Sequence, residues 1–141
     1  SVDVEIGNQK ISLSGINDPD KERFTGKSGD FYSELDEIQR EKDDNLFRIL
    51  LAHRPSYIEN YLKYDFDLVL CGHAHGGQWR LPPFLNGVFA PDEGWLPKYA
   101  GGKYDFPNGQ MIVSRGLARE STRVPRIFNR PELVIVNVVG K

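Results

Sequence analysis

All three histidines of the chain lie at the ends of short apolar runs. His73 and His75 stand one residue apart, among glycines, directly behind Leu68–Cys71, and His53 follows the apolar stretch Leu46–Ala52. Imidazole is a common protein ligand for zinc, manganese, iron and similar ions. Three histidines placed in this way indicate a metal site rather than three unrelated surface residues.

The spacing of His73 and His75 bears on how many ions such a site would hold. If residues 72–75 are extended, the two side chains project to the same face, about 6–7 Å apart. That separation is too wide for one ion, and it suits two ions about 3.5–4 Å apart that each take one imidazole. A mononuclear zinc site with three histidines is the alternative that the spacing leaves open.

A centre with two divalent ions also requires carboxylates, because neutral imidazoles bring no negative charge. Asp65 and Asp67 precede the second apolar run instead of following it, and Asp18 and Asp20 lie in a turn cluster. The remaining candidates lie on what reads as a solvated helical face: Asp36, Glu37, Glu41, Asp43 and Asp44. These positions are wrong for metal binding, so the residues argue for half of a metal site.

The apolar pattern places the histidines at one edge of a sheet. A hairpin is predicted for residues 2–14, with its turn at Gly7-Asn8, and a helix for 31–43 that Asp30 caps. Strands are predicted for 46–52 and 66–71, around a helix that begins at Pro55. This strand–helix–strand order predicts a parallel pair with the histidines at its carboxyl ends, the edge where open α/β sheets bind ligands.

The later part of the chain has a different character. Residues 79–109, which are rich in proline and glycine, read as a long loop region with short strands. Strands are predicted again for Met111–Ser114 and Leu133–Val139. The aromatic residues of this region either pack the loops or line a groove for lipid or glycan: Trp79, Phe84, Phe89 and Trp95.

The composition restricts the class of protein. The chain has 141 residues, a length typical of one domain, and its formal charge of −2 gives no electrostatic support for nucleic acid binding. It contains no apolar run of about 20 residues, so no membrane-spanning helix is expected. Cys71, the single cysteine, is expected to be a small buried residue rather than a nucleophile.

The motif Gly72-His73-Ala74-His75 behind an apolar strand, with His53 behind an earlier one, resembles the calcineurin-like metallophosphoesterase superfamily. The resemblance covers nearly the whole chain and is closest to the bacterial branch typified by YkuE and YaeI. It is carried further by downstream segments: Gly76–Pro82, Ala90-Pro91, Pro97–Tyr99, Met111–Leu117 and Arg126–Leu133.

The resemblance implies a function and a set of site residues. His53 and His73 would bind one divalent metal ion and His75 a second, with Mn, Fe, Zn or similar ions as the cofactors. In the family such ions bind phosphate oxygens and lower the pKa of a bridging water, whose hydroxide then attacks the phosphorus of a phosphate mono- or diester. Arg115, Arg119 and Gln78 are the candidate substrate-binding residues, since arginine suits phosphate.

The first-half motifs of the family are missing. They are Asp-Xaa-His, Gly-Asp-Xaa-Xaa-Asp and Gly-Asn-His-Asp/Glu, and family members are roughly twice as long. We therefore expect residues 1–141 to form the C-terminal half of the domain, a fragment that is inactive alone, with no certain catalytic residue of its own. The implied fold is half of a four-layer α/β/β/α sandwich, a mixed β-sheet with flanking helices.

Half a sandwich leaves apolar surface uncovered. The expected partners are therefore a phosphoester substrate and either the missing N-terminal half or a second copy of the chain. For the full-length protein the resemblance also allows a position near a membrane. The alternative to a piece of an enzyme is a non-catalytic module that binds a metal or a partner.

Overall fold

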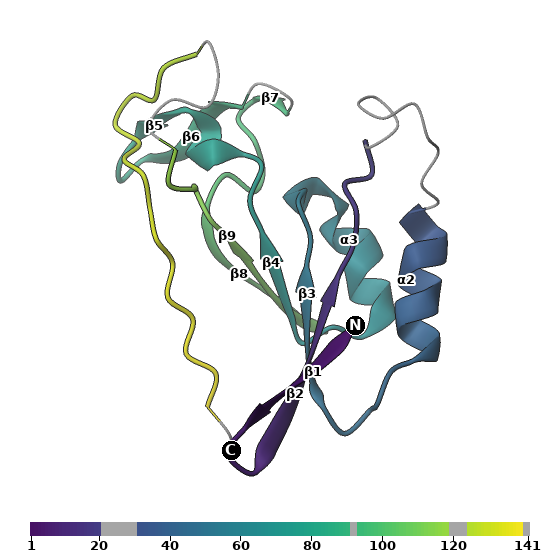
Figure 1. The fold of residues 1–141 in the computed structure, drawn as a ribbon. Coiled ribbons are helices and arrows are strands. Elements are labelled where there is room, and N and C mark those ends of the chain that lie inside the picture. The colour runs from purple at the N-terminus through teal and green to yellow at the C-terminus, as the bar shows by residue number, and fades with distance from the viewer. Residues whose placement is uncertain (21–30, 91–92, 119–123, 140–141) are drawn as a thin grey trace.

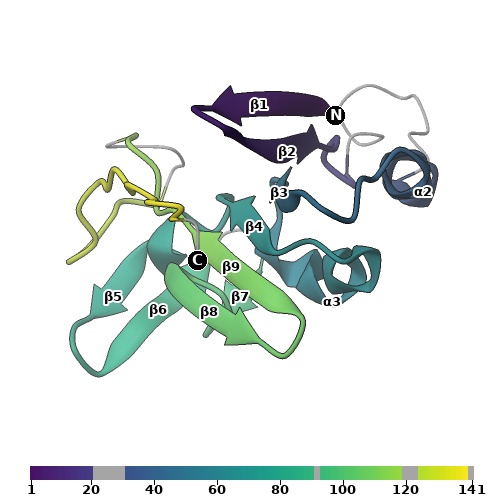
Figure 2. The ribbon, with the colours of Figure 1, turned by 90° about the horizontal axis from the view of Figure 1, so that it is seen from below.

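The computed structural model describes residues 1–20, 31–90, 93–118 and 124–139. Its main feature is a six-stranded sheet in the order β1-β2-β3-β4-β9-β8 (Figures 1 and 2). The strands are β1 (Val2–Ile6), β2 (Gln9–Gly15), β3 (Phe47–Leu51), β4 (Leu68–Cys71), β8 (Gly102–Phe106) and β9 (Gly109–Val113). The four central strands are parallel and the two outer ones antiparallel, so the predicted mixed α/β fold is confirmed.

The predicted hairpin at the start of the chain is confirmed. β1 and β2 pair antiparallel, with Val4 opposite Ile11, and Gly7 takes a φ of 62° in the turn between them. Glycine adopts this left-handed conformation without the strain that a Cβ would bring. β2 then lies parallel to β3, which places the end of the hairpin beside the strand that leads to His53.

Two helices cover one face of the sheet. They are α2 (Phe31–Arg40) and α3 (Ile58–Tyr61), the latter extended at both ends by short 3-10 helices, Pro55–Tyr57 and Leu62–Tyr64. Both were predicted, and Asp30, the predicted cap of α2, lies outside the described residues. The helix side chains Leu35, Ile58 and Tyr61 are fully buried against the sheet. They form the core together with strand residues, among them Leu50, Val69 and Met111.

The opposite face of the sheet is open. A groove of about 670 Å³ runs along it, between sheet residues such as Ile49, Leu68 and Leu70 and the extended segment that includes Val136 and Val138. Figures 1 and 2 show this segment standing off from the sheet on the side away from α2 and α3. An apolar sheet face with so little cover is what half of a sandwich would present.

The predicted strand over Leu133–Val139 is wrong. These residues are extended but pair with no described strand, and Leu133, Ile135 and Val139 are 74%, 78% and 82% exposed. The β-type pattern alone does not make a strand, because a strand needs a neighbour for its backbone N–H and C=O groups.

Residues 79–109 contain more strand than the sequence indicated. A second, three-stranded sheet is formed by β5 (Trp79–Leu81), β6 (Leu85–Ala90) and β7 (Gly94–Trp95), and β8 follows. No helix interrupts the described part of this region, as predicted, and β9 confirms the strand predicted at Met111–Ser114. None of the described helices is long and apolar enough to cross a membrane.

Candidate metal centre

His53 and His73 meet where neighbouring parallel strands end. β3 ends at Leu51 and β4 at Cys71, with Leu51 directly opposite Leu70, so the residues that follow leave the sheet side by side. Nε2 of His53 lies 3.1 Å from Nδ1 of His73, and the two rings are nearly perpendicular with centroids 4.8 Å apart. The predicted convergence of these two histidines at the carboxyl edge of the sheet is therefore observed.

The geometry of this pair suits a shared metal ion. Two nitrogens bound tetrahedrally to one zinc ion at about 2.0–2.1 Å lie about 3.3 Å apart. The observed separation of 3.1 Å is close to that value. Within the described residues, however, no group of three or more His, Cys, Asp or Glu side chains gathers closely enough to hold an ion. The donor set thus fits one side of a metal site.

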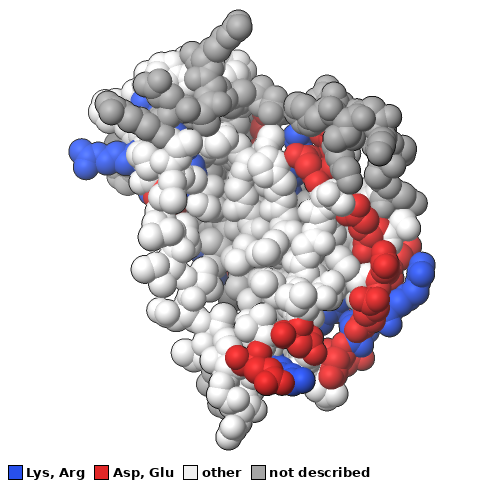
Figure 3. Space-filling view, in the orientation of Figure 1, with Lys and Arg blue, Asp and Glu red and all other residues white. Residues whose placement is uncertain are grey.

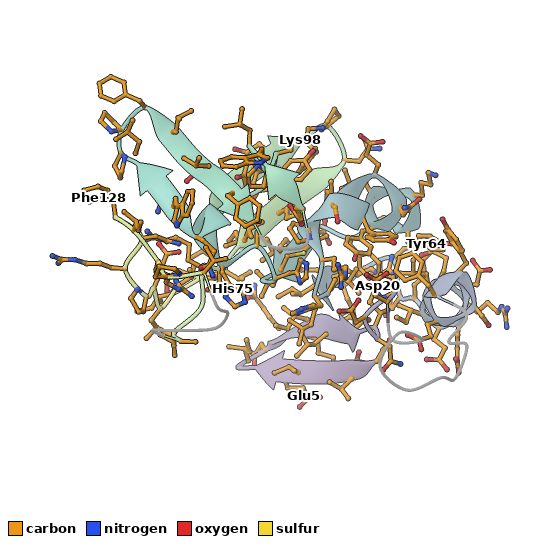
Figure 4. All side chains as sticks on the ribbon, turned by 90° about the horizontal axis from the view of Figure 1, so that it is seen from above. Glu5, Asp20, Tyr64, His75, Lys98 and Phe128 are labelled. Carbon is orange, nitrogen blue, oxygen red and sulfur yellow. The ribbon has the colours of Figure 1, made fainter. Side chains whose placement is uncertain are left out.

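The segment that carries His73 and His75 is not extended. The two side chains were expected to project to the same face only if it were, so that expectation is wrong. His73, His75 and Gly76 have φ angles of 62°, 48° and 70°, and residues 75–77 form a 3-10 turn. His75 is directed to the C-terminal part of the chain, where its Nδ1 lies 3.3 Å from Nη2 of Arg126. Figure 4 shows His75 between the small sheet and the β1–β2 hairpin.

The sequence placed Asp18 in a turn cluster, a position judged wrong for a metal ligand; the structure brings this cluster close to His53, although no three-ligand group forms among the described residues. Asp18 lies three positions beyond the end of β2, at the same edge of the sheet, and its Oδ2 is 3.7 Å from Nε2 of His53. Burial opposes ionisation of this carboxyl, but the hydrogen bond and charge of Arg54 outweigh it and lower the pKa of Asp18. A carboxylate therefore does stand beside the imidazole pair.

Arg54 connects this carboxylate to the histidines. Its side chain is 9% exposed; Nε donates to Oδ1 of Asp18 at 2.8 Å, and Nη2 lies 3.0 Å from Asp20. Nη1 lies 3.1 Å from Nε2 of His73, and the backbone carbonyl of Arg54 accepts a bond from the buried hydroxyl of Tyr61 at 3.0 Å. The result is a partly buried network that reaches His73 through Arg54 and His53 through Asp18.

Asn129 supports the loop of residues 72–78, which we call the histidine loop, through hydrogen bonds to its backbone. The side chain is 3% exposed, and its Nδ2 donates to the backbone carbonyls of His75 at 2.5 Å and Gln78 at 3.2 Å. Gly76 faces the same amide, where a Cβ would come within 2.4 Å of Oδ1. Glycine at this position is therefore needed both for its backbone conformation and for the approach of Asn129.

The three predicted substrate-binding residues have different environments. Gln78 is fully buried, and its Nε2 donates to the carbonyl of Val124 at 2.9 Å, a contact that supports the loop. Arg115 forms an ion pair with Glu132 at 2.6 Å. Arg119 lies outside the described residues. Substrate binding by any of the three stays a prediction.

Arg126 contacts His75 as Arg54 contacts His73, and the sequence analysis did not name it among the site residues. Its Nη2 donates to the carbonyl of Arg115 at 2.7 Å and approaches His75, whereas Nε and Nη1 are buried without a partner in the described structure. Burial, with a contribution from the charge of Arg115, lowers the pKa of Arg126. The sequence held no local signal for this contact, because 51 residues separate Arg126 from His75.

Cys71 is a buried free thiol at the end of β4. Burial, together with the nearby charge of Glu93, raises its pKa to about 12. The thiolate is the nucleophilic form of cysteine, and here it is suppressed. This agrees with the expectation that Cys71 fills space beside the site.

Known proteins similar to the chain are bacterial. An uncharacterized metallophosphoesterase of Aquifex aeolicus is 34% identical over 140 residues, which is 98% of this chain and 49% of the relative. YkuE of Bacillus subtilis, also an uncharacterized metallophosphoesterase, is 38% identical over 65% of the chain and 31% of its own length. The phosphodiesterase YaeI of Escherichia coli is 37% identical over 67% of the chain and 33% of its own length. No protein-family model and no solved structure matches the chain.

These similarities define the class: the chain is a homologue of the bacterial metallophosphoesterases. Within that class it is related to YkuE and YaeI, as the sequence motifs indicated. The chain spans about half the length of the Aquifex relative and a third of the other two. Such partial coverage agrees with one half of the family domain.

Proposed function

We propose that the chain supplies one side of a two-ion phosphoesterase centre and that the complete protein hydrolyses phosphate mono- or diesters there. His53 and His73 would bind one ion and His75 the other, with Mn, Fe, Zn or similar ions as candidates. The observation that carries the proposal is the contact of the His53 and His73 imidazoles at the ends of neighbouring parallel strands. The names of the relatives support the same chemistry.

The residues around the imidazoles have a positioning role in this proposal. Divalent ions, when bound, would stabilise charge on phosphoryl oxygens and activate water. Arg54 would keep Asp18 and the ring of His73 in place through its N–H groups, and Asp18 would add a negative charge beside the His53 nitrogen that faces His73. Arg126, with buried N–H groups beside His75, would add positive charge where a phosphate group approaches.

The chain alone is proposed to be inactive. Among the described residues the imidazole pair has Asp18 as a neighbouring carboxylate, but no group of three ligands forms. The remaining ligands would come from the missing half of the domain, packed on the open sheet face that includes Ile49, Leu68 and Leu70. Without that half, a second copy of the chain is the alternative cover for the same face.

Reconstitution tests the proposal. The chain is mixed with the part of the Aquifex relative that it does not match, and hydrolysis of a chromogenic phosphodiester is followed with Mn²⁺ present. We expect activity only in the mixture, its loss in His75→Ala, and its retention in Glu37→Ala, which alters an exposed residue of α2. Equilibrium dialysis with Mn²⁺ is run on the same samples.

A non-catalytic binding module is the second candidate, and the absence of a three-ligand group from the described residues favours it. It predicts no metal uptake and no hydrolysis in the mixture. Hydrolysis in the mixture that survives His75→Ala, or no metal uptake and no hydrolysis at all, would refute the phosphoesterase proposal.

A further inference from the structure

The small sheet presents apolar side chains on one side. Trp79 lies opposite Phe89, Leu81 opposite Leu85, and Phe89 opposite Trp95. Directly opposed residues point to the same face of a sheet, so these five form one surface, which we call the aromatic face. The rings of Trp79, Phe89 and Trp95 contact one another, with centroids 5.3 to 6.1 Å apart.

The aromatic face is only partly covered by the rest of the described chain, since Trp79 and Phe89 are half-buried and the other three are exposed. Trp95 is 69% exposed and Leu81 50%, and Phe84, in the turn between β5 and β6, is 81% exposed. The body of the protein lies against other atoms of β6: Nδ2 of Asn86 donates to the carbonyl of Gly101 at 2.6 Å, and Gly87 packs on Ala100. Exposed apolar side chains grouped on one side of a sheet are a candidate binding surface.

Charge is divided unevenly along the chain, and the aromatic face lies in the positive part. Residues 79–130 contain eight Lys and Arg against four Asp and Glu, whereas residues 1–78 contain nine against fifteen. Figure 3 shows the acidic side chains of the visible face gathered mainly on the side of α2, away from the small sheet. Among the basic residues of this part, Lys98 has a side chain that is 73% exposed, and its 4.0 Å ion pair with the exposed Glu59 of α3 is weak in water.

This combination matches one kind of partner. Tryptophan and other aromatic residues settle at the boundary between lipid headgroups and acyl chains, and basic residues around them are attracted by anionic headgroups. A second copy of the chain would bring the same positive charge to the contact, so self-association through this face is disfavoured.

We propose that the aromatic face docks on an anionic lipid bilayer. The histidine loop would then lie close to the membrane, because Gly77 packs directly on Gly87 of β6, where a Cβ on Gly77 would come within 2.7 Å of the Gly87 Cα. If the proposed function holds, phosphoesters at a bilayer surface are the substrate class within reach. The docking itself does not depend on catalysis.

Intrinsic fluorescence can test the docking, because both tryptophans of the chain belong to the aromatic face. The chain is titrated with vesicles of phosphatidylglycerol and phosphatidylethanolamine, and separately with phosphatidylcholine vesicles. We expect a blue shift and quenching by brominated acyl chains with the anionic vesicles, at least tenfold tighter binding than to phosphatidylcholine, and weakening by salt.

Two variants make the test specific. Phe84→Ser removes an exposed side chain beside the face and should weaken binding about tenfold or more. Tyr32→Ser removes an aromatic side chain that is 53% exposed on the acidic side and should leave binding unchanged. Circular dichroism of both variants confirms that the fold is retained.

Several results would overturn the docking. They are equal binding to phosphatidylcholine, no spectral change with either vesicle, a blue shift that follows protein concentration without lipid, and loss of vesicle binding when the missing half of the domain is added. Vesicle binding is measured without substrate, and hydrolysis of the soluble phosphodiester should be the same in Phe84→Ser. A failure of docking is therefore distinct from a failure of the proposed function.

Discussion

Replacement of Asn129 should release the histidine loop. Its buried amide donates to two backbone carbonyls, those of His75 and Gln78. Each such bond contributes about 0.5–1.5 kcal/mol net, and a buried carbonyl left without a donor costs about 1–3 kcal/mol. Water entering the space left by Asn129→Ala would satisfy part of this, so we expect a loss of about 2–4 kcal/mol in the free energy of unfolding.

Asn129→Asp has nearly the same shape and adds a pH dependence. The carboxylate would face carbonyl oxygens, which disfavour its charged form and raise its pKa above the ordinary value of about 3.9. A carboxyl whose pKa is higher in the folded state destabilises the protein most at pH 7. The penalty relative to the unmodified chain should therefore shrink as the pH falls through the folded-state pKa, because the protonated group can donate one bond.

Urea unfolding followed by tryptophan emission measures both effects, since Trp79 adjoins the loop and donates to the carbonyl of Pro125 at 3.2 Å. Asn137→Ala, which alters an exposed asparagine, is the matched control and should change the stability by less than about 0.5 kcal/mol. A loss of that small size in Asn129→Ala, or a penalty in Asn129→Asp that does not depend on pH, would refute the role given to Asn129.

Three further predictions concern the supports of the site and are measured by the same unfolding assay. Gly77→Ala should lower the free energy of unfolding by about 3 kcal/mol or more, because a Cβ would meet backbone at 2.7 Å and the φ is 63°. Gly7→Ala is the control, with φ 62° and open space around the Cβ, and should lower it by about 1 kcal/mol. Equal losses in the two variants would contradict this reasoning. Tyr61→Phe removes a buried 3.0 Å hydrogen bond and should cost about 1–2 kcal/mol, unless the hydroxyl contributes nothing to stability. The hydrogen bond from Arg115 lowers the pKa of Glu132, so Glu132→Gln should destabilise the protein at pH 7. The difference in stability between the variant and the unmodified chain should vanish as the pH falls through the lowered pKa. A difference that stays constant with pH would argue against the ion pair.

Much of the scaffold was predictable from local patterns. The alternation on either side of Gly7 specified the hairpin, and the run of apolar residues before His53 and His73 specified two buried strands joined by a helix. Parallel pairing then follows from chain connectivity, since a helix between two strands returns the chain to the same end of the sheet. The meeting of His53 with His73 is a consequence of that topology.

The contacts that the sequence did not reveal come from residues far apart in the chain. Asp18 lies in a turn, and only the parallel pairing of β2 with β3 shows that this turn is at the histidine edge. Asn129 and Arg126 reach the loop of His75 from more than 50 residues away. The glycines around His73 indicated a tight turn, but not that two histidines themselves take positive φ angles. Tertiary packing decides such conformations.

The uncovered segment Leu133–Val139 has a consequence for handling the protein. Its seven residues, LVIVNVV, combine high β-propensity with no charge and no proline, the signature of sequences that stack into cross-β fibrils. We therefore expect this exposed segment, and not the histidine edge, to limit the solubility of the chain through amyloid-like aggregation.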